Sequence, residues 1–245
     1  MNLFLLSAPP VDGKFEVLAL EDGRRFDHIV GHLGLKLGGS LRFGVIGRGK
    51  GVACLMDRCS TRLVFAVKEY VDCAAHDVAD IELLIALPRP QMVKRILETC
   101  STFGVRTVRF VHSDKVEKNY WQSPVLADAA IQQSLLLGAE QAGSTFIPSI
   151  VLHRPVGKRT KSFIDTAETF NNKTIVLHPG PYPLLEAHKH ADSSNIRSIL
   201  IGPEGGFSAN EIAKLSESCV MFRSLGSRIL RVETAVTAVL SRVCL

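Results

Sequence analysis

The feature that most constrains the fold is a change of pattern near residue 80. After it, continuous apolar runs alternate with segments of helical periodicity, which predicts an α/β domain with a mainly parallel sheet. Before it, short apolar runs are separated by Gly, Asp and Arg turns, a spacing that predicts a small β-barrel. These runs are residues 3–6, 15–20, 41–46, 52–56 and 63–71. The polar stretch 72–80 divides the chain into expected domains at 1–72 and 81–245.

The individual elements can be predicted from the same patterns. A helix opens at Pro90 and closes before Gly104, and a second is capped by Ser123-Pro124 and runs to about residue 142. A final helix has an apolar stripe on one face between Val232 and Val243. A short helix is also expected at 26–35. Strands are expected at 81–87, 105–111, 174–177, 198–201 and 220–225.

Composition limits the class of protein. The chain has 245 residues, 46% of them hydrophobic and 22% charged, which allows a real core and excludes disorder. A net charge of +5 suits a polyanionic partner without requiring one. The six cysteines form no CxxC pair, so we expect buried thiols in a reduced compartment and no metal site. Without a signal peptide or membrane span, we expect a soluble cytoplasmic protein, or an organelle-matrix protein if the source is eukaryotic.

The segment IGPEGGFSANEI, residues 201–212, carries the first chemical signal. Ser208 and Glu211 have the spacing of a capping box, and Phe207 and Ile212 have that of a hydrophobic staple, so a helix start is strongly specified. Three glycines before it, at the carboxyl end of a strand, allow a ligand to approach the backbone closely. A tight strand–helix connection without a ligand is the alternative interpretation.

The segment LGSRILRVETA, residues 225–235, repeats the strand–turn–helix arrangement. Arg228 and Arg231 lie before the helix, where their charge opposes the helix macrodipole. This placement indicates a compensating anion or partner, although a solvated arginine is also possible. The tetrapeptide LHPG, residues 177–180, is a third strand followed by a turn, and alone it is a weak signal.

These segments resemble the RsmE family of 16S rRNA (uracil-N3) methyltransferases, within the SPOUT superfamily. The family pattern is LIGPEGGxSxxEI followed by LGxRILRxETA, and the chain matches both in order and separation. Glu140-Gln141 before Pro148 also resembles the family's EQxxR…P segment. The resemblance extends over 81–245, and in the expected barrel it rests on His28 and the layout of strands.

The resemblance implies a fold and a cofactor. It implies a PUA-like, RNA-binding β-barrel followed by a SPOUT methyltransferase domain with a trefoil knot, which general topology rules would not suggest. It also implies a homodimer and S-adenosylmethionine (SAM) held by the three loops. The cofactor-binding residues expected from the resemblance are Leu177, His178, Pro179, Gly180, Ile201, Gly202, Pro203, Glu204, Gly205, Gly206, Leu225, Gly226, Ile229, Leu230 and Thr234.

The implied reaction sets requirements on the site. Uridine N3 carries a proton, so an enzyme must help to remove that proton or stabilise the resulting anion. Arg231 is the first candidate to stabilise the uracil anion, and Glu204 is a possible proton acceptor or cofactor ligand. The partner is expected to be rRNA or the assembled small ribosomal subunit. Basic residues that could hold its phosphates are Arg24, Arg25, Arg42, Arg48, Lys50, Arg154, Lys158 and Arg159.

Four positions depart from the family pattern and leave alternatives open. Gly34, Thr102, Ser144 and Val232 replace an arginine, a glutamate, an arginine and a threonine, while the cofactor loops are intact. The alternatives are a SPOUT methyltransferase acting on tRNA or another RNA, and a SAM-binding, non-catalytic RNA-binding or assembly protein. Residues 44–51, GVIGRGKG, resemble a P-loop but lack its Ser or Thr and its helix, so we expect a hairpin turn there.

Overall fold

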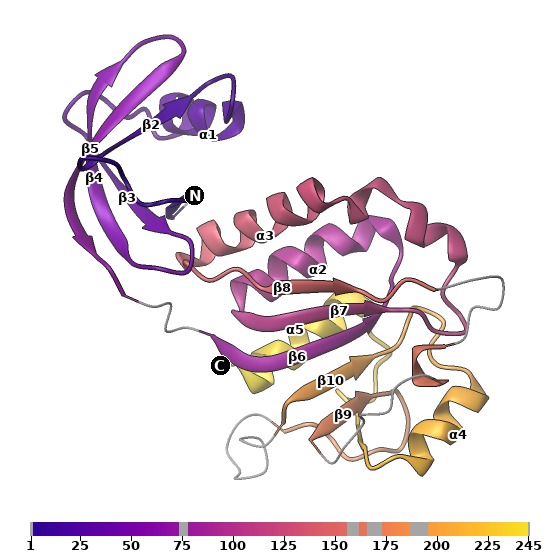
Figure 1. The fold of residues 1–245 in the computed structure, drawn as a ribbon. Coiled ribbons are helices and arrows are strands. Elements are labelled where there is room, and N and C mark those ends of the chain that lie inside the picture. Colours follow the sequence, from indigo (N-terminus) through magenta and orange to yellow (C-terminus); the bar gives the residue numbers. More distant parts are fainter. Residues whose placement is uncertain (1, 74–77, 156–161, 166–172, 187–195, 245) are drawn as a thin grey trace. The chain divides into compact units, whose positions relative to one another are not determined.

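The computed structural model describes residues 2–73, 78–155, 162–165, 173–186 and 196–244 (Figure 1). The chain forms two compact units. The first unit contains Met1–Asp77 and Ala139–Phe146, and the second contains Val78–Gly138 and Ile147–Leu245. In the described residues, no helix has the length and apolar character needed to cross a membrane.

The first unit is built on a five-stranded sheet. Its strands, in spatial order, are β1 (Phe4–Leu6), β3 (Ser40–Val45), β4 (Lys50–Arg58), β5 (Arg62–Val71) and β2 (Lys14–Leu18). Only the β1–β3 pair is parallel. The pairing of β4 with β5 shifts register twice, and such bulges bend and twist strands. The sheet therefore curls (Figure 1). Its apolar core contains several phenylalanines, of which Phe15 stacks on Phe65 with ring centroids 5.0 Å apart.

Two local expectations in this unit have clear outcomes. The short helix is present but begins earlier, as α1 (Gly23–Asp27) continued by a π-helical turn, η1 (His28–His32). It begins at Gly23 because the Asp22 carboxylate caps it, accepting a hydrogen bond from Arg25 N at 3.4 Å.

The P-loop-like segment is the hairpin turn between antiparallel β3 and β4, as expected. Gly47 in this turn has a φ of +69°.

Glu140 anchors the segment Ala139–Phe146, which belongs to the first unit although it is distant in sequence from the rest of that unit. Its carbonyl oxygen accepts hydrogen bonds from Asn2 N and Leu3 N at 3.2 and 3.1 Å. Its carboxylate is 2% exposed and pairs with Arg25 Nε at 2.9 Å and with Arg24 Nη2 at 3.1 Å. A buried carboxylate needs such partners, because an unpaired charge away from water is costly.

The second unit contains a six-stranded sheet in which every neighbouring pair is parallel. The expectation of an α/β fold is therefore confirmed. The spatial order is β11 (Met221–Arg223), β9 (Thr174–Leu177), β10 (Ser198–Ile201), β6 (Ala79–Ala86), β7 (Val105–Val111) and β8 (Ser149–Leu152). Strand β8 was not expected, because it is four residues long and none of its side chains is fully buried.

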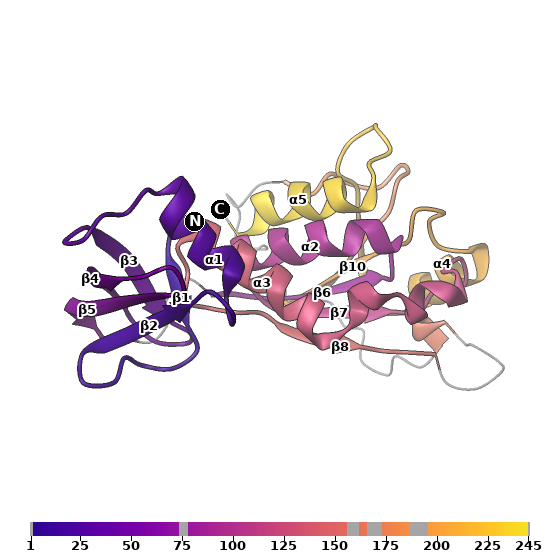
Figure 2. The ribbon, with the colours of Figure 1, turned by 90° about the horizontal axis from the view of Figure 1, so that it is seen from above.

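Helices cover both faces of this sheet. Leu83 and Ile85 of β6 belong to a core shared with α2 (Pro90–Thr102), α3 (Asp128–Ala142) and α5 (Val232–Val243). Figure 2 shows these three helices side by side. Leu84 points to the opposite face, into a second core with Leu215 of α4 (Ala209–Glu217). Successive strand side chains alternate between faces, so strands that read as continuous apolar runs are buried on both.

The expectation of one helix running from Ser123 was wrong at its start. Two short 3₁₀ turns, η2 (Lys118–Gln122) and η3 (Pro124–Leu126), precede α3, and a third, η4 (Phe163–Asp165), follows β8. Ser123 does cap a turn, because its Oγ accepts from Val125 N at 3.5 Å. Ala127 is then extended, with φ −72° and ψ 142°, so the α-helix begins only at Asp128.

The expectation of buried thiols was only partly right. Cys54 and Cys100 are buried, whereas Cys59, Cys73 and Cys219 are exposed. The exposed three lie in loops or just beyond helix and strand ends, where no apolar layer covers them. Burial raises the pKa of the Cys244 thiol to about 11.

Candidate functional site

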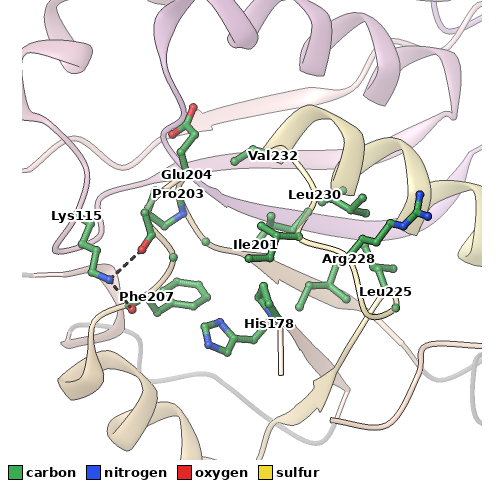
Figure 3. Close-up of a pocket in the computed structure, with 18 residues that line it drawn as sticks. Lys115, His178, Ile201, Pro203, Glu204, Phe207, Leu225, Arg228, Leu230 and Val232 are labelled. Atoms are coloured by element: carbon green, nitrogen blue, oxygen red, sulfur yellow. Dashed lines mark hydrogen bonds between the residues drawn. The ribbon is translucent and has the colours of Figure 1, made fainter. Parts of the chain in front are cut away.

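A cavity of about 380 Å³ opens at the carboxyl ends of β9 and β10 (Figure 3). Its walls come mainly from three loops, residues 177–179, 201–207 and 225–230, with Val232 and Ala235 of α5. This edge of a parallel α/β sheet is where ligands usually bind, because loops there are free to diverge while the strands fix their ends.

The turn after β10 is fixed by its own sequence. Gly206 N donates to Pro203 O at 2.8 Å, and Gly206 has a φ of +66°, which glycine adopts without strain. The Phe207 ring packs against Gly202, where a Cβ would lie 3.2 Å from the ring. The amide N–H groups of Glu204 and Gly205 have no hydrogen-bond partner among the described residues, so they are available to a ligand.

The expected capping box is present at the start of α4. Glu211 N donates to Ser208 Oγ at 3.1 Å, and Ser208 N donates to Glu211 Oε2 at 2.8 Å. The fully buried Glu211 carboxylate also accepts from Asp114 N at 3.0 Å, from Ser113 Oγ at 3.2 Å and from Ser162 Oγ. Burial acts to raise the pKa of Glu211, but these donors outweigh it and hold the pKa below its ordinary value. Glu211 thus ties three chain segments together.

Lys115, from the loop after β7, reaches the same turn. Its Nζ donates to Gly205 O at 2.9 Å and to Phe207 O at 3.2 Å (Figure 3). Its aliphatic stem lies over Gly205, where an added Cβ would be 3.2 Å from Lys115 Cδ. The sequence analysis missed Lys115, because a single lysine in a polar loop carries no local signal of a long-range contact.

His178 lines the cavity beside Phe207 and contacts further aromatic rings behind it. The centroid of its ring lies 6.2 Å from the centroid of the Phe207 ring and 6.0 Å from that of the Tyr182 ring. Tyr182 in turn stacks on Phe222 at 4.9 Å. Burial, and then the positive charge of Lys115, lower the pKa of His178, so its imidazole is neutral at pH 7.

The loop after β11 is held by α5. Arg242 donates to Leu225 O at 3.3 Å and to Leu185 O at 2.9 Å, so one guanidinium spans two chain segments. Ser224 Oγ accepts from Gly226 N at 3.1 Å and closes the turn. Ile229 is 84% exposed at the rim of the cavity, an unusual position for a large apolar side chain.

Known proteins resemble this chain over nearly its whole length. A family model described as an RNA methyltransferase domain matches residues 75–244. Ribosomal RNA small subunit methyltransferase E of Treponema pallidum (strain Nichols) is 30% identical over 242 residues, which cover 97% of this chain and 88% of that protein. The chain belongs to the RsmE family of RNA methyltransferases. Methyltransferase E 1 of Borreliella burgdorferi is 24% identical to this RsmE-family chain, over 97% of it and 95% of the relative.

Solved structures share the fold of this RsmE-family chain. The methyltransferase E of Neisseria gonorrhoeae, solved with S-adenosyl methionine bound, has a TM-score of 0.70 and 16% identity, covering 98% of this chain and 95% of that one. A Thermotoga maritima protein described as a predicted RNA methyltransferase has a TM-score of 0.67 and 17% identity, covering 100% and 97%. The family resemblance drawn from the sequence motifs is confirmed.

The structure gathers most of the cofactor-binding residues expected for the RsmE family. All of them line the cavity except Gly180 and Thr234, which are exposed and lie outside its lining. Glu204 lines the cavity, but its Oε1 accepts from Arg89 N at 2.9 Å and Figure 3 shows its carboxylate directed away from His178. Arg231 is exposed at the N-cap of α5, and the cavity is lined by its neighbours Leu230 and Val232 rather than by Arg231 itself.

The residues expected to bind RNA have different surroundings. Arg25 supports the fold: besides Glu140, its guanidinium contacts Leu5 O at 2.9 Å and lies over the Phe4 ring. Arg24 shares Glu140 but is 42% exposed. Arg42 lies on β3, Arg48 in the hairpin turn and Lys50 at the start of β4. Arg48 Nη1 lies 3.6 Å from Asp72 Oδ2. Arg154 donates to Trp121 O, whereas Lys158 and Arg159 lie outside the described residues.

The structure shows the conformation and contacts of the four residues that depart from the RsmE pattern. Gly34 has a φ of +56°, a conformation that disfavours the family's arginine. Ser144 is buried in the first unit and its Oγ accepts from Phe146 N at 3.1 Å. Thr102 is exposed and donates to Glu98 O at 2.8 Å, and Val232 is buried beside the cavity. Within the described ranges, no three His, Cys, Asp or Glu side chains are grouped so as to hold a metal ion.

Proposed function

We propose that this RsmE-family chain is a SAM-dependent methyltransferase that modifies N3 of a uridine in small-subunit rRNA. One observation carries the proposal: the two loops that match the family motifs line a single cavity with the loop after β9, at the carboxyl edge of the parallel sheet. The names of the relatives support the substrate, since the Treponema pallidum protein is a ribosomal RNA small subunit methyltransferase. The Neisseria gonorrhoeae structure, with its bound S-adenosyl methionine, supports the cofactor.

The residues at the cavity suit an adenosyl ligand. Leu177, Leu225 and Leu230 provide apolar walls for a purine, and the free N–H groups of Glu204 and Gly205 provide donors for its acceptor atoms. The cavity volume of about 380 Å³ is within the range of small-molecule sites. His178, being neutral, adds no repulsion toward a sulfonium cation.

The proposed mechanism assigns separate tasks to the chain's own residues. Bound SAM supplies an electrophilic methyl group. Arg231, at the N-cap of α5 between two cavity-lining residues, stabilises the negative charge that develops on the uracil as N3 loses its proton. Glu204 is the proposed proton acceptor through Oε2, since Oε1 is held by Arg89 N.

The other proposed features concern partners and location. We propose that the domain expected at 1–72 is a PUA-like RNA-binding domain whose Arg42, Arg48 and Lys50 contact phosphates. The domain expected at 81–245 is proposed to be a SPOUT domain with a trefoil knot that forms a homodimer. The exposed side chain of Ile229, in the loop 225–230, supports such an interface, because exposed apolar surface often marks a protein–protein contact. The proposed site of action is the cytoplasm.

The test is mass-spectrometric mapping of modified nucleotides in rRNA and tRNA from a deletion strain and from its complemented control. We expect one methylated uridine to disappear from small-subunit rRNA and to return on complementation. Loss of a methyl group from tRNA instead would indicate the alternative substrate. Unchanged RNA, together with SAM binding by the purified protein, would indicate a non-catalytic RNA-binding or assembly protein.

A further inference from the structure

The turn between β10 and α4 contains two peptide groups that are fixed at both ends. In the Gly205–Gly206 peptide, the oxygen accepts from Lys115 Nζ and the N–H donates to Pro203 O. In the Phe207–Ser208 peptide, the oxygen accepts from Lys115 Nζ and the N–H donates to the Glu211 carboxylate. Glycine-rich turns otherwise rotate their peptide groups easily, because glycine has few steric limits. Lys115 therefore restrains the carbonyl end of both peptide groups.

Lys115 is itself held in position by the Glu211 network. The residue before it, Asp114, donates its N–H to Glu211 Oε1 at 3.0 Å and accepts from Ser208 Oγ at 2.6 Å. Ser113 donates to the other carboxylate oxygen at 3.2 Å. The loop after β7 is thus attached to the start of α4 on one side of the turn, and Lys115 extends from this attachment across Gly205.

We propose that Lys115 is a positioning residue for the adenosyl ligand, acting through the backbone of the 203–207 turn. By holding Gly205 O and Phe207 O, it fixes the turn that carries the free N–H groups of Glu204 and Gly205, two residues that line the cavity. A preorganised donor binds a ligand more tightly, because its conformational entropy is lost during folding and not during binding. This inference rests on the proposed function, and it names a residue that determines cofactor affinity rather than transfer chemistry.

Two adenosyl probes separate this role from a direct contact. S-adenosylhomocysteine carries an amino-acid carboxylate that an ammonium group could bind directly, whereas 5′-methylthioadenosine has none. If Lys115 acts through the turn, Lys115→Met weakens both probes by the same factor, on the order of 10-fold for the loss of one or two charge-assisted hydrogen bonds. If Lys115 instead binds the carboxylate, only S-adenosylhomocysteine is weakened.

The experiment uses calorimetry on the full chain with both probes, steady-state methyl transfer and thermal unfolding. For Lys115→Met we expect a higher Kd for each probe, a KM for SAM raised in parallel, an unchanged kcat and a melting temperature close to wild type. Lys115→Arg is expected to restore part of the affinity, because a guanidinium can donate to two carbonyls. The control Lys118→Met removes an exposed lysine from the same segment and should change none of these values.

A second variant tests the same contact from the other side. Gly205→Ala places a Cβ 3.2 Å from Lys115 Cδ at a position without a positive φ, so it displaces the stem without straining the backbone. We expect it to weaken both probes as well. Unchanged affinity in Lys115→Met, or weakening of S-adenosylhomocysteine alone, overturns the inference and leaves the proposed function standing. Wild-type protein that binds neither probe overturns the proposed function first.

Discussion

Replacing Glu211 by glutamine should destabilise the second unit in a pH-dependent way. The carboxylate accepts through both oxygens: Oε1 from Asp114 N and Ser162 Oγ, and Oε2 from Ser208 N and Ser113 Oγ. A glutamine has the same shape but only one acceptor oxygen. In either orientation its NH₂ group faces one of the two backbone N–H groups, which then loses its partner.

The expected magnitude follows from this geometry. A buried N–H left without an acceptor costs about 1–3 kcal/mol, and the hydrogen bonds that remain lose the strength that a charged acceptor gives them. We expect Glu211→Gln to lower the free energy of unfolding by roughly 2–4 kcal/mol, or the melting temperature by roughly 5–15 °C for a unit of this size. Glu217→Gln, at the exposed end of α4, is the matched control and should have little effect.

The pH dependence gives the sharper test. The pKa of Glu211 is lowered in the folded chain, so its contribution is complete above the unfolded pKa and is lost as the pH falls through the folded one. The difference in melting temperature between wild type and Glu211→Gln should therefore be largest near pH 7 and shrink in acid. Calorimetric unfolding across this range measures it. A difference that stays constant with pH, or no difference at all, would refute the assignment of Glu211 as an ionised hydrogen-bond acceptor.

Three further predictions follow from other sites. Arg231→Ala should reduce the single-turnover rate of methyl transfer by about 10²–10³-fold with little change in SAM affinity, and an unchanged rate would remove Arg231 from the catalytic residues. Glu140→Ala should cost about 1–3 kcal/mol in denaturant unfolding of the full chain, because it removes one of the two carboxylates that pair with the largely buried Arg25 and leaves Asp22, at 3.1 Å, as the other; a cost near zero would contradict the buried pair. Sedimentation at micromolar concentration should give the mass of a dimer, and a monomeric mass would count against the proposed homodimer.

Local sequence determined several parts of this protein without any tertiary information. The capping box at Ser208 and Glu211, the positive φ at Gly206 and the bounds of α2 all depend on residues within a few positions of one another. Alternation of buried strands with amphipathic helices predicted a parallel α/β sheet for the same reason. The cavity loops were found because each follows a strand, and parallel strands end at one edge.

Tertiary structure alone decided which distant segments meet. The spatial order of the strands, with β10 between β9 and β6, cannot be read from their similar apolar patterns. Ala139–Phe146 joins the first unit through Glu140, although its neighbours in sequence belong to the second. Lys115 contacts Gly205, and Arg242 contacts Leu185, across long stretches of chain. A lone lysine, arginine or glutamate has no local partner that marks it, because its contacts exist only once the sheet and helices have brought the segments together.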